Sequence, residues 1–249
     1  MYIQARFFLY LFLLAIVPAC RTVYRSHTVQ FKDYRITPSL ETDSAVRVFL
    51  QPYGDSVNKS MNRVLGYAAQ SLEKTQPEGS LGNFMADAFL YMAREKYQTQ
   101  VDLAFVNFGG IRLTQLPAGP VTRGKVFELM PFDNVLILQK LKGTVLQQVL
   151  DLTAARGGWP VAGITMQIKA GKAVNVKIGG RMLDPETEYT IANSDFIANG
   201  GDNADMLRPV PQISNGYLMR DAIIDYILLL EKQGKKITAQ KENRVSHAE

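Results

Sequence analysis

Two short segments of this chain combine residue types that local structure alone does not require. The first places Asn107, Gly109, Gly110 and Arg112 directly after an apolar stretch. Glycines at such a position let the backbone approach a ligand closely, and an arginine offers a planar fork of donors to a phosphate or carboxylate. A Gly-Gly turn with a surface arginine is the simpler interpretation, and this segment alone favours it.

The second segment runs from Phe196 to Asp202 and places an aromatic ring, two glycines and a carboxylate on one loop. A phenylalanine in a polar, glycine-rich loop is poorly explained as part of a core. It suits a stacking surface for a planar ligand, and Asp202 can accept hydrogen bonds from sugar hydroxyls. By itself, neither segment establishes a binding site.

Asn83 and Asp87 form a further polar pair, four residues apart and therefore on one face of a helix. For these two we favour a structural role, with the side chains facing solvent or holding a neighbouring loop.

Residues for catalysis are scarce. A two-metal phosphoesterase site needs several His and Asp ligands, but the chain has only two histidines, His27 and His247, which lie near its ends and are expected at the surface. A serine triad would have to use the same two histidines, and no Walker-type phosphate loop is present. We therefore predict no catalytic residue and no metal ligand in this chain.

The hydrophobic periodicity predicts helices and strands that alternate along the chain, and hence an α+β (mixed α/β) fold. Ser80, Thr122 and either Ser214 or Asn215 are the expected helix N-caps. Helices are expected at 81–97, 123–129, 144–155 and 216–233, strands at 101–107, 134–140, 163–169, 173–178 and 188–193, a short strand at 28–34, and helical or mixed structure at 44–69.

The N-terminus has the pattern of an export signal. An uninterrupted apolar run from Phe7 to Val17 is too short to span a bilayer comfortably and is followed by Cys20, the only cysteine. This arrangement resembles the lipobox of bacterial lipoproteins, in which the cysteine is lipidated; an ordinary signal peptide with an incidental buried cysteine is the alternative. We predict a lipoprotein signal at 1–20, a tether at 21–44 and one folded domain at 45–249.

Composition narrows the function classes. The chain is 47% hydrophobic and 20% charged, with a net charge of +5 and a pI near 9.2. The basic residues are dispersed, so no nucleic-acid partner is predicted.

Taken together and in order, these segments resemble the C-terminal, substrate-binding domain of the 5'-nucleotidase family. The resemblance covers about residues 45–245. It rests on five motifs: Gly82-Asn83 with Ala86-Asp87-Ala88, Asn107-Phe108-Gly109-Gly110-Ile111-Arg112, Met130-Pro131-Phe132-Asp133-Asn134, Leu141-Lys142-Gly143 and Asn199-Gly200-Gly201-Asp202.

The resemblance implies roles for individual residues. Phe132 and Phe196 fall on the two phenylalanines that clamp the nucleobase, and Asn107 and Asn134 on amides that contact the base region. Arg112 matches a phosphate-binding arginine. Asp202 matches the carboxylate that binds ribose hydroxyls, and Asn199 belongs to the same motif.

The sequence departs from the family pattern at one phosphate-binding position. The family commonly has a further phosphate-binding arginine shortly before the Gly82-Asn83 motif, whereas here residues 73–78 contain Lys74 and no arginine. A phosphate would be bound more weakly unless Lys74 or a partner protein supplies the missing charge, which puts nucleotide as opposed to nucleoside binding in question.

The family's hydrolysis takes place in a separate metallophosphoesterase domain, for which residues 1–44 are too short. The first hypothesis is therefore a split enzyme of nucleotide catabolism, in which a separately encoded partner holds the divalent metals. The alternative is a non-catalytic envelope lipoprotein that captures nucleosides or nucleotides, and a third is a structural remnant. A lipid anchor on the periplasmic face of the outer membrane is the expected location.

Overall fold

The computed structural model describes residues 30–37, 40 and 43–249. Two compact units are distinguished, one ending at Arg47 and the other spanning Val48–Glu249. Cys20, the signal segment and part of the tether lie outside the described residues. Residues 30–37 have no regular secondary structure, so the described part of the strand expected at 28–34 is not a strand.

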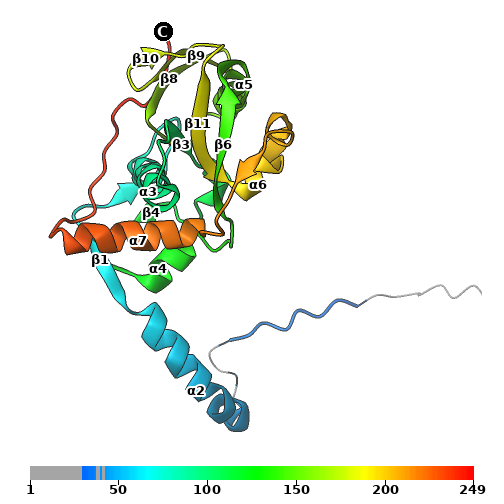
Figure 1. Ribbon diagram of the computed structural model, residues 1–249. Helices are drawn as coiled ribbons and strands as arrows, with labels where there is room; N and C mark the ends of the chain where they lie inside the picture. Colours follow the sequence, from blue (N-terminus) through cyan, green and yellow to red (C-terminus); the bar gives the residue numbers. More distant parts are fainter. Residues whose placement is uncertain (1–29, 38–39, 41–42) are drawn as a thin grey trace, which may run out of the picture. The chain divides into compact units, whose positions relative to one another are not determined.

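A five-stranded mixed sheet forms the centre of the second unit (Figure 1). Its central strand β11 runs parallel to β3 on one side and antiparallel to β6 on the other. The strand order is β12 (Gln212–Ile213), β6 (Leu136–Lys142), β11 (Glu188–Ser194), β3 (Leu103–Phe105) and β7 (Val161–Ala162).

The inner strands of this sheet are mostly buried on both faces, and alternate residues of each strand point to opposite sides. Ala104 and Ala192 belong to one core, which also holds helices α3 (Ser80–Tyr97) and α7 (Met219–Lys232). Leu103 and Ile191, their neighbours in sequence, point into a second core together with α5 (Gly143–Ala155). The predicted α+β class is confirmed.

The second core is closed by a four-stranded sheet. Its order is β10 (Arg181–Met182), β9 (Lys172–Ile178), β8 (Ile164–Lys169) and β13 (Val245–His247). The predicted hairpin between β8 and β9 is present, and β13 brings the C-terminal segment alongside β8 in parallel. Two small ladders join β1 (Val64–Ala68) to β5 (Gly119–Thr122) and β2 (Leu72–Glu73) to β4 (Gln115–Leu116).

Of the helix N-caps predicted from the sequence, one is present in the structure. The Thr122 side chain caps α4 (Arg123–Leu129) by accepting from the Lys125 N–H at 3.2 Å, as predicted. The Ser80 prediction is wrong: the cap position is Gly79, and the Ser80 hydroxyl accepts from the Glu73 N–H instead. Helix α7 begins only at Met219, so neither Ser214 nor Asn215 caps it.

The strand limits also shift. The strand expected at 101–107 is confined to Leu103–Phe105, and the one expected at 134–140 begins two residues later, at Leu136. Residues 106–107, after β3, and 134–135, before β6, belong to the loops at the same edge of the sheet. The segment expected to be helical or mixed divides into a continuous helix α2 (Ser44–Met61) and the strand β1. Among the described residues, no helix has both the length and the apolar character needed to span a membrane.

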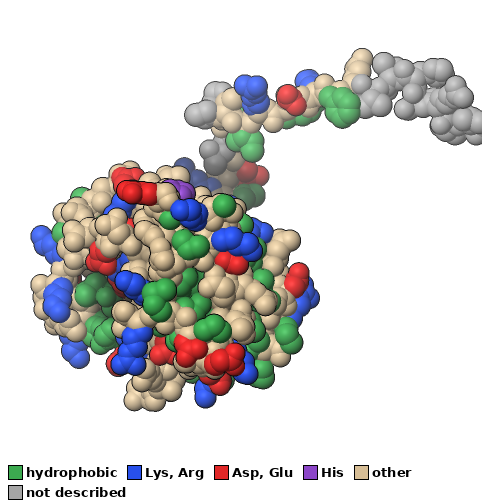
Figure 2. All heavy atoms as spheres, turned by 90° about the horizontal axis from the view of Figure 1, so that it is seen from above, with side chains coloured by type: hydrophobic (Ala, Val, Ile, Leu, Met, Phe, Trp, Pro, Cys, Tyr) green, Lys and Arg blue, Asp and Glu red, His purple; other side chains and the backbone are tan. Residues whose placement is uncertain are grey.

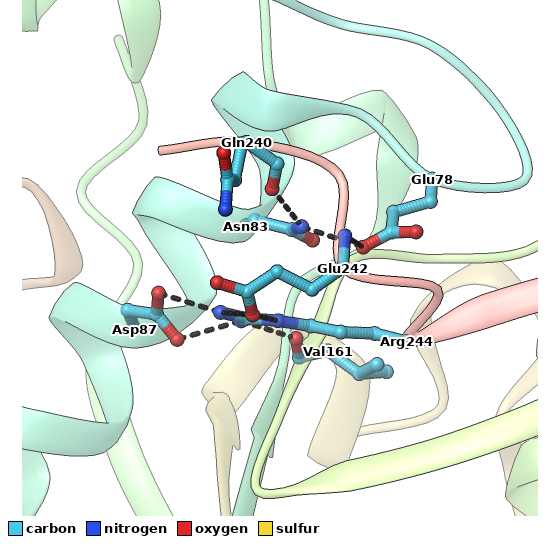
Figure 3. Close-up of polar contacts among 7 residues, drawn as sticks. All are labelled: Glu78, Asn83, Asp87, Val161, Gln240, Glu242 and Arg244. Atoms are coloured by element: carbon cyan, nitrogen blue, oxygen red, sulfur yellow. Dashed lines mark hydrogen bonds and ion pairs between the residues drawn. The ribbon is translucent and has the colours of Figure 1, made fainter. Parts of the chain in front are cut away.

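Asn83 and Asp87 hold the C-terminal segment against α3 (Figure 3). Asp87 binds the Arg244 guanidinium through both oxygens, at 2.6 and 2.9 Å. Asn83 donates to the Gln240 carbonyl at 2.9 Å and to the Glu78 carboxylate at 2.7 Å. The structural role predicted for this pair is therefore confirmed.

The charged side chains on the face seen in Figure 2 are of both signs and are interspersed with apolar and uncharged surface. This view agrees with the dispersed basic residues of the sequence, from which no nucleic-acid partner was predicted.

Candidate functional site

Three loops converge at one edge of the central sheet because of its topology. β3 and β11 are parallel, so their carboxyl ends meet at the same edge, and the antiparallel β6 begins there. Ser194, the last residue of β11, is paired with Leu136, the first of β6. The predicted segments follow β3 and β11 and precede β6, so residues about 90 positions apart in sequence become neighbours.

A cleft of about 290 Å³ lies among these loops. It is lined by Gly109, Gly110 and six of the seven residues that the sequence assigned to substrate binding: Asn107, Arg112, Phe132, Asn134, Phe196 and Asp202. The volume lies at the lower limit of small-molecule sites, which suits a ligand of nucleoside size.

Two aromatic rings face this cleft while remaining open to solvent. Phe132 is 40% exposed and Phe196 is 45% exposed, although both belong to an otherwise well-packed domain. Phe196 lies on the short helix α6 (Asp195–Ala198), which the Ser194 hydroxyl caps at the Ile197 N–H. Large rings left open in a concave site offer stacking surfaces rather than core packing.

The Phe196 ring has room because position 201 carries no side chain. A Cβ atom on Gly201 would lie 2.5 Å from the Phe196 ring, a distance that Cβ atoms do not tolerate. The loop that carries Phe132 is fixed differently, by Arg220, which donates to the Phe132 carbonyl at 3.3 Å and pairs with Asp133 at 2.5 Å.

Asp202, which lines the cleft, is held by two side chains. Its Oδ2 accepts a hydrogen bond from Asn107 Nδ2 at 2.7 Å, and its Oδ1 lies 3.9 Å from Arg156 Nη1. Arg156 also donates to the side chain of Asn203 at 2.8 Å. Asp202 and Asn203 both adopt positive φ, 52° and 64°, so the loop keeps a conformation that these residue types visit only with local support.

Asn107 packs its amide directly over Gly110. A Cβ atom at Gly110 would come within 2.7 Å of Asn107 Oδ1, so a glycine is needed there for the amide to reach Asp202. This close contact explains one of the two glycines that follow Asn107.

The cationic side of the cleft is formed by Arg112. Its Nη1 donates weakly to the Gly109 carbonyl at 3.4 Å, and its guanidinium lies 5.8 Å from the centre of the Phe132 ring. Among residues 43–249, no carboxylate lies within ion-pair distance of Arg112. This guanidinium is therefore available to an anionic ligand.

Lys74 is close to Arg112 but is not among the residues that line the cleft. Its ammonium donates to the Ile111 carbonyl at 2.7 Å and sits 4.0 Å from the centre of the Phe108 ring. Burial, and after it the charge of Arg112, lowers the pKa of Lys74. Lys74 thus adds positive potential next to Arg112 without presenting its own ammonium to the cleft.

Asn199 is the one predicted residue that stays apart from the cleft. Its Oδ1 accepts from Gln212 Nε2 at 2.9 Å, so in this structure it supports the loop. Arg156 and Arg220 are the contributors that the sequence reasoning missed. Neither stands in a recognisable motif, and only the tertiary fold brings them to the site.

The cleft can bind a planar group between exposed rings, hydroxyls at Asp202 and an anion at Arg112. Among the described residues, no three His, Cys, Asp or Glu side chains are grouped closely enough to hold a metal ion. His247 lies on β13, exposed, and His27 is outside the described residues. The groups that line the cleft are thus aromatic rings, amides, a carboxylate and a guanidinium.

Comparison with known proteins is consistent with this geometry. Residues 57–209 match the family described as 5'-nucleotidase, C-terminal domain. A 5'-nucleotidase of Vibrio cholerae is 27% identical over 205 residues, which cover 77% of this chain and 35% of that protein.

Solved structures give the same result. The 5'-nucleotidase precursor of Thermus thermophilus superposes with a TM-score of 0.71 and 28% identity, covering 82% of this chain and 43% of that one. The NAD nucleotidase of Haemophilus influenzae shares the fold, with a TM-score of 0.62 at 19% identity over 83% of this chain and 42% of that one. The chain thus spans only about a third to two fifths of these relatives.

Proposed function

Because the chain belongs to the 5'-nucleotidase C-terminal domain family, we propose that its cleft recognises a nucleoside or nucleotide on behalf of a 5'-nucleotidase-type phosphohydrolase. One observation carries this proposal: Phe132, Phe196, Asp202 and Arg112 line the same cleft although they come from three separate loops. The rings stack on the base, the carboxylate accepts from the ribose hydroxyls and the guanidinium binds phosphate. Asn107 and Asn134 supply amides to the base edge.

Hydrolysis is assigned to a separately encoded metallophosphoesterase that supplies the divalent metals. The donor set for two metals is missing from the described residues, and the chain covers about a third of the length of the Vibrio cholerae relative. In such a split enzyme, binding of the nucleoside would position the phosphate over the partner's metal pair, so that binding energy lowers the barrier. The physiological role would be nucleotide catabolism.

The proposed location is the cell envelope. The apolar run before Cys20 supports export and lipidation of that cysteine, with the folded domain facing the periplasm at the outer membrane. A catalytic partner would then have to be exported to the same compartment.

A second function, capture of nucleosides without chemistry, is favoured by one specific feature. The segment before α3 carries only Lys74 where the family commonly has an arginine, and Lys74 is already bound to the Ile111 carbonyl. Arg112 would then be the single cation among the described residues that line the cleft, and adenosine should bind about as tightly as AMP.

Calorimetry of residues 21–249 with adenosine and AMP tests the proposal. Phe196→Ala should weaken binding, since stacking of a base on an aromatic ring contributes about 1–3 kcal/mol. Phe49→Ala is the matched control, because Phe49 is also an exposed phenylalanine, 68% accessible, but lies on α2 and does not line the cleft. Equal loss of binding in both variants, or no binding of either ligand at millimolar concentration, would contradict recognition by this cleft.

A further inference from the structure

Helix α2 presents an apolar face that no other part of the second unit, Val48–Glu249, covers. The helix has no buried residue. Four large apolar side chains of the second unit recur at helical intervals and so share one face of α2: Phe49, Leu50, Tyr53 and Val57, each between 52% and 68% exposed. Val48, also 68% exposed, lies off this face.

The sequence nevertheless encodes a helix here. The Asp43 carboxylate accepts from the N–H groups of Ala45 and Val46, at 2.9 and 3.2 Å, which is the pattern of an N-cap. Pro52 and Gly54, by contrast, lie within the helix, and both weaken it. An isolated helix of this length is marginal in water even with good helix formers. Stability of α2 therefore requires a surface that buries its apolar face.

A membrane surface fits α2 poorly. Interfacial helices carry many lysines and arginines on the polar face. The polar side of α2 has Arg47 and Lys59, together with the acidic Asp55. The helix thus lacks the dense positive charge that binds anionic lipid.

The comparison structures indicate what the missing surface is. The part of the chain that follows α2, residues 62–249, makes up 188 of 249 residues, about 76%. The superposition on the Thermus thermophilus 5'-nucleotidase covers 82% of the chain, so it must include part of α2. Only 43% of that longer protein is covered. Because the matching family is a C-terminal domain, the remainder of the relative precedes it, and α2 stands at this junction.

We propose that the apolar face of α2 is the docking surface for the separately encoded metallophosphoesterase. This inference rests on the proposed function, which requires such a partner, and it adds where that partner binds. The partner should present an apolar groove that accepts Leu50, Tyr53 and Val57 along one helix face. Burial of these side chains would stabilise α2 and join the catalytic domain to the recognition domain at the junction where the relatives are covalently continuous.

Photo-cross-linking in the source cells tests the proposal with the full chain. Benzoylphenylalanine is placed at Tyr53 on the apolar face and, as the matched control, at Asp55 on the polar face, and the adducts are identified by mass spectrometry. We expect an adduct from position 53, and not from 55, with a protein whose sequence carries the His and Asp ligands of a two-metal phosphoesterase. An adduct only with lipid, with this chain or a second copy of it, or with a protein lacking those ligands would overturn the proposal, as would no adduct.

Leu50→Asp provides the second measurement. Leu50 is half exposed, so the change should leave the fold and the binding of adenosine intact. Adduct formation from position 53 should fall by about tenfold or more, because a carboxylate buried in an apolar groove is strongly unfavourable. An unchanged yield would overturn docking through α2. Failure of the unmodified chain to bind adenosine or AMP would instead count against the proposed function of the cleft, so the two failures are distinguishable.

Discussion

Asn107 and Asp202 are 95 positions apart in sequence, and the amide of the first donates to the carboxylate of the second at 2.7 Å. The bond joins the loop after β3 to the loop after β11, which lie at the same edge of the central sheet because these strands are parallel. It occupies one lone pair of Asp202 Oδ2. A carboxylate has about four such sites, so Asp202 retains enough acceptors for a pair of vicinal hydroxyls.

Asp202→Asn should therefore weaken binding of adenosine. Hydrogen bonds to a charged group contribute about 1.5–3 kcal/mol, which corresponds to a loss of roughly 10- to 150-fold in affinity measured by calorimetry. The change is nearly isosteric, so the free energy of unfolding should move little. The control ligand is 2',3'-dideoxyadenosine, which has the base but no hydroxyls for Asp202. An equal loss for both ligands would show that Asp202 acts on the site as a whole and not on the ribose.

Arg156 should contribute to binding through Asp202. It lies 3.9 Å from the Asp202 carboxylate and donates to Asn203 at 2.8 Å, and it thereby supports two residues with positive φ. We expect Arg156→Ala to reduce adenosine affinity by about 1 kcal/mol, in line with an exposed ion pair and one hydrogen bond. A double-mutant cycle with Asp202→Asn should be non-additive, because Arg156 acts on the ligand through that carboxylate. Strict additivity would mean that Arg156 acts independently.

Local sequence patterns located most of the secondary structure. The helices at 123–129 and 144–155 and the strands at 163–169 and 173–178 lie within a residue or so of their predicted limits, because their periodicity and turn glycines are local properties. Helix α7 begins later than predicted because its start is set by a tertiary contact: the Met219 N–H donates to the Asn134 carbonyl. Such a contact leaves no local signal.

Only those residues of the candidate site that belong to short sequence motifs could be predicted. Phe196 and Asp202 were named from the combination of residue types on their loop, and Phe132 from the resemblance to the family. Arg156 and Arg220 were not, since each works through a partner about 45 or more positions away. Asn199 shares a motif with Asp202, yet its side chain faces Gln212, because adjacent residues in a tight loop point in different directions.

Gly201→Ala should disturb the cleft through Phe196. The new Cβ would lie 2.5 Å from the Phe196 ring and 2.6 Å from its carbonyl oxygen, so the ring has to move. Adenosine affinity should fall about as far as in Phe196→Ala, by roughly 1–3 kcal/mol for a lost stacking surface. Gly54→Ala is the matched control, because a Cβ there meets nothing within 4 Å and Gly54 does not line the cleft. Full affinity in Gly201→Ala would show that the position of the Phe196 ring is unimportant.

Arg244→Ala should lower stability without affecting binding. The Arg244 side chain is 13% exposed, pairs with Asp87 through two hydrogen bonds and fixes the C-terminal segment on α3. Because Asp87 retains partial access to water, we expect a loss of about 1–3 kcal/mol in urea unfolding, less than for a fully buried pair. Arg208→Ala removes an exposed pair with Asp205 and should cost less than about 0.5 kcal/mol. Similar losses in the two variants would show that the C-terminal segment is not held by this ion pair.

Arg112→Ala should weaken binding of AMP and leave binding of adenosine nearly unchanged. Arg112 lines the cleft and has no carboxylate partner among residues 43–249, and the Lys74 ammonium behind it adds positive potential. If the guanidinium binds phosphate, AMP should lose about 1.5–3 kcal/mol of binding free energy, whereas adenosine should change little. Lys74→Met should produce a smaller loss for AMP, because Lys74 acts only through its charge. Calorimetry at two salt concentrations checks both variants, since the AMP contribution should shrink as salt screens it. Equal affinities of the unmodified chain for AMP and adenosine would instead favour a nucleoside-binding lipoprotein.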